Sequence, residues 1–166
     1  DKALEVYQGL REIGEPQGMV LCGSQAMNIR RMEAAILNIG AEIDWTTTPL
    51  ELGWDRMIDW DRDFIGKEAL AAQRDNGVKR RIAGLTLEGD TLAKGSDAVL
   101  HDGAQVGTIS SAMWGPTIEK SIALCMLDTT AWQDGTALTV VTESSAIAAT
   151  VTPLPFFDAE RKLPRA

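Results

Sequence analysis

A series of short apolar runs after Gly77, separated by turn signals, constrains the fold of this chain more than any other feature. Glu88-Gly89-Asp90, Gly115-Pro116 and Asp134-Gly135 are typical of turns, and the runs between such signals read as strands. Short strands at this spacing are typical of a small antiparallel barrel or sandwich. We therefore expect strands at residues 81–87, 98–100, 105–110, 121–127, 137–142 and 147–151.

The part of the chain before Gly77 has a different pattern of apolar residues. Residues 3–13 space apolar side chains as on one face of a helix, and a glycine then ends that helix. Residues 18–22 predict a short strand. Ser24 is a favourable N-cap for a helix that runs to about Leu37. This order of strand, cap and helix predicts one α/β unit.

The next stretch, residues 41–65, predicts irregular structure, in part because Pro49 pushes the residue before it toward extended backbone. Residues 66–74 predict a short helix that stops at Asn76-Gly77. We therefore predict an α+β chain of two domains. They are a partial α/β unit at residues 1–77 and a small antiparallel β-barrel domain at residues 78–166.

The composition and charge of the chain limit the classes of partner that we expect it to bind. The chain has 166 residues, of which 45% are hydrophobic, and its formal net charge is −8. An acidic surface repels phosphate backbones, so we expect no nucleic-acid partner. No apolar run approaches the roughly 18 residues that span a bilayer, and the first residues lack the pattern of a signal peptide. We therefore expect a cytoplasmic protein without a membrane partner.

The cysteines and the single histidine predict no metal site. Cys22 and Cys125 each lie in an apolar run, which predicts two buried, reduced thiols. His101 precedes the turn signal Asp102-Gly103, so we expect it to be an exposed turn residue. Zinc sites need clusters of Cys and His, and this sequence contains none.

Glu33 is the most informative single residue for chemistry. On the predicted helix it shares an apolar face with Ile29, Ile36 and Leu37. An acid on such a face is costly unless another group satisfies it. One explanation is an ion pair with Arg30, three residues earlier. The other is a carboxylate that accepts paired N–H donors from a ligand.

Arg62 and Trp114 are two further candidates for ligand contact. Arg62 either pairs with Asp61 or Asp63 or reaches an anionic ligand. Trp114, which precedes Gly115-Pro116, is a lid, a stacking platform for an aromatic ligand, or core filling. The sequence contains neither a nucleophile motif nor a phosphate-binding glycine-rich loop, so it leaves the catalytic residues unknown.

Five ordered strings resemble the glycine-cleavage T-protein (aminomethyltransferase) superfamily. They cover nearly the whole chain, and their shared order makes the resemblance specific. The string closest to the family's most recognisable one is Asp63-Phe64-Ile65-Gly66-Lys67-Glu68-Ala69-Leu70. The others are Ala26-Met27-Asn28-Ile29-Arg30-Arg31-Met32-Glu33-Ala34, Gly40-Ala41-Glu42-Ile43-Asp44 followed by Thr48-Pro49-Leu50-Glu51, Val106-Gly107-Thr108-Ile109-Ser110-Ser111, and Gly115-Pro116-Thr117.

The resemblance implies tetrahydrofolate as cofactor and a small methyl or aminomethyl donor. It implies that Glu33 holds the pterin ring and that Arg62 touches the folate. Trp114, as a possible stacking platform, is a further candidate to contact this cofactor. Family members usually carry a long N-terminal folate-binding region, with a catalytic aspartate, ahead of the first helix here. We therefore expect the distal part of a one-carbon transferase, inactive without this missing region.

Departures from the family pattern keep alternatives open. Ile39 stands where the family has an aromatic residue, and Ala112 where it has a glycine. These changes leave room for a relative that demethylates a methylated sulfur, nitrogen or aryl-oxygen compound. Residues 63–70 contain no cysteine, which argues against relatives that support iron–sulfur assembly. The alternative to a transferase is a non-catalytic folate-binding or structural module of the same superfamily.

Overall fold

The structure, a computed structural model, describes residues 2–160 and 162. It combines helices with a closed sheet, which confirms the α+β expectation. The helices are α1 (Ala3–Gly14), α2 (Ser24–Glu33) and α3 (Lys67–Asn76), and the 3₁₀ turns are η1 (Glu15–Gln17) and η2 (Asp55–Met57). The strands are β1 (Arg80–Leu87), β2 (Ala98–His101), β3 (Ala104–Gly115), β4 (Lys120–Asp128), β5 (Ala137–Val141) and β6 (Ala146–Thr152).

The strands form a closed antiparallel barrel in the order β1-β4-β3-β2-β5-β6. Every strand expected after Gly77 is present. β3 is longer than expected because its pairing with β4 continues to Gly115 and Lys120. The ladder shifts register between Ile109 and Ser111, and such a bulge bends a strand, which helps a small sheet to close.

Apolar side chains fill the inside of the barrel. Successive side chains of a strand point to opposite faces, so alternate residues of each strand face inward. Leu85, Cys125 and Val140, from three different strands, are buried in this inner core. The interior of the barrel is therefore packed with side chains.

A second apolar core covers the outer wall of β1 and β4. Ile122 and Leu124 of β4 pack in one cluster with Met32 of α2. The segment after β6 closes over β1, and Gly84 makes this approach possible. A Cβ at Gly84 would lie 2.6 Å from Leu154 Cδ2. Helix α2 and the C-terminal segment are thus fixed on the same side of the barrel.

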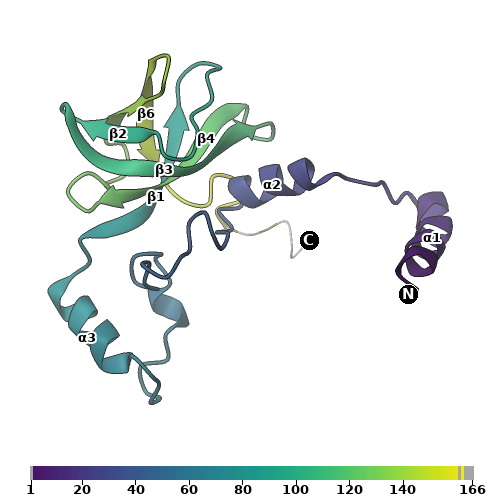
Figure 1. Ribbon diagram of the computed structural model, residues 1–166, viewed down its shortest axis with the longest axis horizontal. Helices are drawn as coiled ribbons and strands as arrows, with labels where there is room; N and C mark the ends of the chain where they lie inside the picture. The colour runs from purple at the N-terminus through teal and green to yellow at the C-terminus, as the bar shows by residue number, and fades with distance from the viewer. Residues whose placement is uncertain (1, 161, 163–166) are drawn as a thin grey trace.

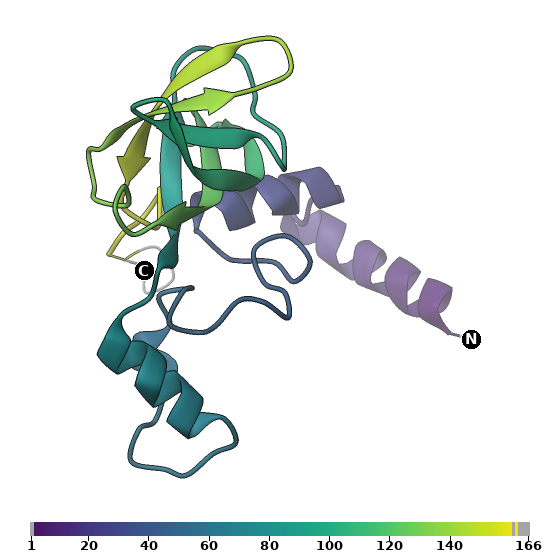
Figure 2. The ribbon, with the colours of Figure 1, turned by 60° about the vertical axis from the view of Figure 1, so that its left-hand side comes forward.

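Helix α1 lies apart from the barrel, beyond an extended segment that leads to α2 (Figures 1 and 2). It packs against η1 and buries none of its own residues within the described chain. The apolar side chains that predicted it, among them Leu4, Leu10 and Ile13, are exposed. The α1 helix is therefore confirmed, but its apolar face meets no core here.

Three expectations about residues 18–37 are wrong. Residues 18–22 form no strand, because none of the described strands lies beside them to share hydrogen bonds. Cys22 is consequently exposed, whereas Cys125 is buried as expected. Helix α2 begins after Gly23 as N-cap and ends at Glu33, because Ala35 adopts a left-handed backbone (φ +53°).

The expectations for α3, for residues 41–65 and for the turn after His101 can each be compared with the structure. Helix α3 forms between Gly66 and Gly77, both of which have positive φ, and residues 41–65 are irregular apart from η2. His101 is the last residue of β2 and only partly exposed, and the turn itself is Asp102-Gly103. The domain boundary near residue 78 stays a prediction.

Among the described residues, no helix is long and apolar enough to cross a bilayer. In the same part of the chain, no group of three or more His, Cys, Asp or Glu side chains is placed to hold a metal ion.

Candidate functional site

Three glutamates, Glu33, Glu42 and Glu51, are buried in the segment that precedes α3. A buried carboxylate is strongly unfavourable unless hydrogen bonds and an opposite charge compensate for lost water. Each of the three meets a different part of the barrel, so together they show how this segment is attached.

Glu33, the last residue of α2, is 1% exposed. Its Oε1 accepts a hydrogen bond from the Thr117 backbone N–H at 2.7 Å, and its Oε2 accepts one from the Thr117 hydroxyl at 2.8 Å. Arg30 donates to Oε2 at 2.9 Å. The ion pair with Arg30 considered from the sequence is therefore present. Thr117, in the loop between β3 and β4, supplies a further pair of donors.

Glu42 lies in the turn after α2, and no part of its side chain is exposed. The hydroxyls of Ser110 and Ser111 on β3 donate to its Oε1 at 3.0 and 2.5 Å. The Asn38 N–H and the Arg31 guanidinium donate to its Oε2 at 2.9 and 3.2 Å. Four donors thus satisfy this carboxylate, and the strong bonds that ionised acceptors form offset part of the cost of burial.

Glu51 ties the same segment to the start of β1. Arg80 donates to Glu51 Oε1 at 2.8 Å and to the Thr46 carbonyl oxygen at 2.8 Å. Glu51 Oε2 accepts the Thr48 N–H at 2.8 Å, and Thr48 Oγ1 accepts the Glu51 N–H at 3.3 Å. The Ile82 N–H then donates to the Glu51 carbonyl oxygen. Glu51 therefore links the irregular segment directly to the first strand.

The sequence contained Glu42 and Glu51 in its family-like strings but did not reveal their role. The spacing Thr48-x-x-Glu51 is that of a capping box, and this local signal was available. Glu42 carried no local signal, because Ser110 and Ser111 lie 68 and 69 positions further along the chain. The hydrogen bonds that attach these glutamates to the barrel therefore depend mainly on the tertiary fold.

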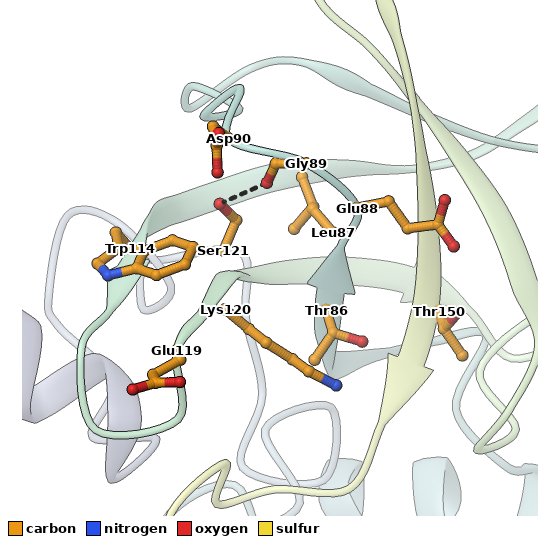
Figure 3. A pocket seen from close by; sticks show the side chains of 10 residues that line it. All are labelled: Thr86, Leu87, Glu88, Gly89, Asp90, Trp114, Glu119, Lys120, Ser121 and Thr150. Atoms are coloured by element: carbon orange, nitrogen blue, oxygen red, sulfur yellow. Dashed lines mark hydrogen bonds between the residues drawn. The ribbon is translucent and has the colours of Figure 1, made fainter.

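Trp114 stands at one end of the barrel, where β1 and β3 end and β4 begins (Figure 3). It is 41% exposed, so it is not core filling. It forms part of the wall of a pocket of about 420 Å³. Leu87 and Ser121, both buried, belong to the same lining, and the Ser121 hydroxyl donates to the Gly89 carbonyl oxygen at 3.4 Å.

Charged side chains surround this Trp114 pocket, which is lined by Thr86, Leu87, Glu88, Gly89, Asp90, Trp114, Glu119, Lys120, Ser121 and Thr150. Three of the lining side chains are acidic and one is basic. Within the described chain, no ion pair involves any of these four charged groups. The pocket therefore presents charges of both signs to solvent.

Arg62 lies elsewhere, in the irregular segment before α3. Its guanidinium is largely exposed and its Nε is 3.3 Å from Asp59 Oδ2, so it pairs with Asp59 rather than with Asp61 or Asp63. It lines a second pocket of about 450 Å³ together with apolar residues such as Phe64. Among the described contacts, none joins Arg62 to Glu33 or Trp114.

Glu33 and Trp114, by contrast, both lie close to the turn between β3 and β4. Glu33 bonds to Thr117, and a Cβ at Gly115 would lie 3.4 Å from Glu33 Oε1. Trp114 is the residue before Gly115. Of the three candidate residues, the structure therefore brings these two to one loop and leaves Arg62 in a separate pocket.

Two pKa shifts bear on the chemistry that the chain offers. Burial raises the pKa of the Cys125 thiol to about 12, so it is not a thiolate nucleophile near neutral pH. Hydrogen bonds from the Thr46 hydroxyl and backbone N–H lower the pKa of Asp44, an exposed carboxylate. Neither residue lines the two pockets described above.

Two family models match the chain on either side of α3. A model described as the glycine cleavage T-protein C-terminal barrel domain matches residues 80–158. A model described as the GCVT N-terminal domain matches residues 1–62. The two matches occur in the order of the strings that the sequence contains.

Curated relatives and a solved structure agree with these matches. An aminomethyltransferase of Synechococcus sp. (strain CC9902) is 38% identical over 143 residues, which cover 85% of this chain and 39% of the relative. That of Synechococcus sp. (strain CC9311) is 35% identical over 159 residues, covering 95% and 42%. The Pseudothermotoga lettingae protein is 32% identical over 157 residues, covering 95% and 43%. The chain thus spans about two fifths of the length of these relatives.

The crystal structure of glycine cleavage system aminomethyltransferase T from Bartonella henselae matches the fold with a TM-score of 0.85. The match covers 94% of this chain and 44% of that chain, at 21% identity. It shows a shared fold for helices and barrel alike. With both family models and the curated relatives, it shows that this chain belongs to the glycine-cleavage T-protein family and carries that family's C-terminal barrel.

Proposed function

We propose that this chain is the distal part of a transferase that moves an aminomethyl or methyl group to tetrahydrofolate. The observation that carries the proposal is the match to relatives named aminomethyltransferase, at 35–38% identity over 85–95% of this chain. The donor is a small molecule, and the departures at Ile39 and Ala112 keep a demethylase reaction within the proposal. We also propose a cytoplasmic location.

The pterin ring of tetrahydrofolate does not fit the Glu33 carboxylate as the structure places it. A pterin would bind through paired N–H donors, which need open acceptor positions on both oxygens. Thr117 and Arg30 already occupy both Glu33 oxygens, and the residue is buried. A pterin there would have to displace Thr117. The roles of Glu33, Arg62 and Trp114 toward folate therefore stay proposals, and no step of the transfer is assigned to them.

The proposal includes a polypeptide partner, the N-terminal folate-binding region that the family resemblance implies. Exposed apolar side chains support it. Trp45 and Ile65 are fully exposed, and Ile39 and Met57 are largely so. Large apolar side chains gathered on one segment mark a surface that another protein part covers. Because the chain spans about two fifths of its relatives, we propose the remaining part of the transferase as that cover.

A second candidate function, a structural module without folate contact, has an observation of its own in its favour. Thr117 and Arg30 satisfy the Glu33 carboxylate, and Arg31 and the two serines of β3 satisfy Glu42. In this candidate, the glutamates attach the helical segment to the barrel and touch no ligand. The chain would then support the transferase region from outside its active site.

Calorimetry with tetrahydrofolate tests the transferase proposal. We would fuse this chain behind the N-terminal part of the Synechococcus relative and compare it with the chain alone. The proposal expects tetrahydrofolate binding and one-carbon transfer by the fusion, and neither by the chain alone. A fusion that folds but does not bind tetrahydrofolate would contradict it.

The variants Glu33→Gln and Thr117→Val, each made in the fusion, then separate the two candidates. Both weaken the contact between α2 and the barrel, but only Glu33→Gln removes the charge that the family resemblance assigns to the pterin. If Glu33 holds the pterin, Glu33→Gln lowers folate affinity by about tenfold or more, because it leaves a mismatched hydrogen-bond pattern, and Thr117→Val does not. Equal folate affinity in the two variants would favour the structural module.

A further inference from the structure

Helix α2 presents an arginine whose hydrogen bonds leave one edge of its guanidinium free. Arg30 bonds through Nη1 alone, which donates to Glu33 Oε2 at 2.9 Å and to Thr117 Oγ1 at 2.8 Å. Within the described chain, its Nε and Nη2 atoms donate no hydrogen bond and enter no ion pair. The side chain is 63% exposed. The edge formed by Nε–H and Nη2–H is therefore available to a ligand.

This free edge distinguishes Arg30 from the other arginines that form ion pairs in the described chain. Arg11, for example, is also helical and pairs with a glutamate, but its Nε and Nη2 both lie against Glu15 Oε1. Each of the remaining arginines with a described ion pair likewise uses Nε or Nη2; they are Arg31, Arg62, Arg74, Arg80 and Arg81.

The two bonds from Nη1 also hold the free edge in place. The Glu33 carboxylate is buried and is fixed by two bonds from Thr117, so it is a rigid anchor. A long exposed side chain normally loses rotamer freedom when it binds a ligand. Arg30 has already lost part of this freedom, because its planar guanidinium is bonded at one end. Binding at the other edge then requires less ordering than at an unattached surface arginine.

The surroundings of this edge suit an anion that carries a small carbon body. Residues 16–32 contain two arginines and no acidic residue, on a chain whose net charge is −8. Met27 lies one turn before Arg30 on the same face of α2 and is 72% exposed. Its flexible thioether adapts well to apolar groups of different shape. The guanidinium edge can therefore take the charged group, and Met27 the carbon atoms next to it.

A carboxylate matches the free edge better than other anions. Its two oxygens lie in one plane and accept the two parallel N–H bonds of a guanidinium, and such charge-assisted pairs are short and strong. Glu33 already offsets one unit of positive charge at Arg30. A ligand group with a single negative charge therefore meets less repulsion than a dianion such as phosphate.

We propose that Arg30 binds the carboxylate of a small organic ligand through Nε and Nη2, while Nη1 stays on Glu33 and Thr117. The inference rests on the proposed function for the source of this carboxylate, which is either the one-carbon donor or the glutamate tail of tetrahydrofolate. It gives α2 a ligand contact that does not need the Glu33 oxygens, which Thr117 and Arg30 occupy.

Heteronuclear NMR of the guanidinium groups in the full chain tests the site without the transfer reaction. The probes are N-acetylglycine and its neutral amide, N-acetylglycinamide. We expect N-acetylglycine to shift the Arg30 Nε–H resonance in a saturable way and to bind at least about fivefold more tightly than the amide, because only the carboxylate brings a charge to both N–H bonds. Equal binding of the two probes, or no shift of this resonance, would overturn the proposal.

Arg30→Lys locates the binding, which the backbone N–H resonances of α2 then follow. Lysine keeps a positive charge beside Glu33, so the chain should stay folded, but it lacks the paired N–H edge. We expect this variant to bind N-acetylglycine about fivefold more weakly. Arg11→Lys is the matched control and should leave binding unchanged, since the same edge of Arg11 already faces Glu15. Unchanged binding in Arg30→Lys, or equal weakening in both variants, would overturn the proposal.

The fusion with the N-terminal part of the Synechococcus relative identifies the source of the carboxylate. If the source is the glutamate tail, Arg30→Lys lowers the affinity of the fusion for tetrahydrofolate about fivefold. Unchanged affinity for tetrahydrofolate assigns the carboxylate to the one-carbon donor. A folded fusion that binds no tetrahydrofolate contradicts the proposed function, whereas the binding of N-acetylglycine by the chain alone decides the Arg30 site.

Discussion

The segment before β1 and the barrel that follows it differ in where their apolar side chains lie. Of the buried apolar residues that the structure describes, only Met32, Leu50 and Leu52 precede residue 80. The barrel contributes the inner core and most of the outer one. The first segment instead exposes large apolar side chains, among them Leu10 of α1 and Trp45.

This difference shows that a segment can form regular secondary structure without contributing much to the stability of the fold. Helix α1 forms because its sequence suits a helix, yet it contributes little buried area. The barrel strands form because each pairs with two neighbours around a closed wall. Burial of apolar area is the main source of folding free energy, so we expect the barrel to supply most of it. The stability of the first segment then depends on the hydrogen bonds of Glu33, Glu42 and Glu51 to the barrel, and on the protein part that covers its exposed apolar side chains.

The largest expected effect concerns the two thiols, one in each region. Burial raises the pKa of Cys125 from 9.0 to about 12, so its thiolate fraction near neutral pH is about a thousandfold below that of an unperturbed thiol. Cys22 is exposed. Labelling with a disulfide reagent in native buffer should modify Cys22 rapidly and Cys125 only after unfolding. Rapid native labelling of both thiols would mean that the barrel opens easily.

A pair of leucine truncations compares the two regions in free energy. Leu85→Ala empties space in the inner core, where the side chain is fully buried, and should lower the free energy of unfolding by about 2–5 kcal/mol. Leu10→Ala on α1 removes an exposed side chain and should change it by less than about 0.5 kcal/mol. Urea denaturation measures both. Similar losses would contradict the view that the barrel carries the stability.

Glu42→Gln tests the attachment between the regions. Its carboxylate is the acceptor for Arg31 and for both serines on β3. The amide keeps the shape but removes the charge opposite a mostly buried Arg31, at a cost of about 1–3 kcal/mol. Hydrogen exchange should rise in α2 and the turn after it, and stay low in β1 and β4. Uniform exchange changes across the barrel would show that the two parts unfold as one.

Much of the fold was predictable from the sequence, because its signals are local. Glycine-containing turns mark the barrel strands, and Gly66 and Gly77 bound α3. The failed strand at residues 18–22 shows the limit. An apolar run suits a strand, but only a neighbouring strand can complete its hydrogen bonds, and the sequence of this segment does not specify one.

The candidate site was less predictable for the same reason. Glu33 was identified as an acid on an apolar helix face, and its local partner Arg30 was correctly considered. Its partner Thr117 lies 84 positions away, and the serines at Glu42 are almost as distant. Periodicity places a residue on a face but does not reveal which loop packs on that face. The exposed Trp114 likewise depends on where the barrel ends.

The smallest expected effect concerns the apolar surface that the first segment exposes. Trp45 is fully exposed, so Trp45→Gln should change the free energy of unfolding of this chain by less than about 0.5 kcal/mol. In the fusion with the N-terminal part of a relative, the same substitution should destabilise by about 1–3 kcal/mol if that part covers the ring, because burial of the indole is then lost. Trp132→Gln on the barrel is the matched control, and it should have similar effects in both proteins. If Trp45→Gln changes the free energy of unfolding of the fusion as little as that of the chain alone, the N-terminal part does not cover Trp45. The apolar surface of the first segment would then stay exposed in the transferase fold and be left for some other partner.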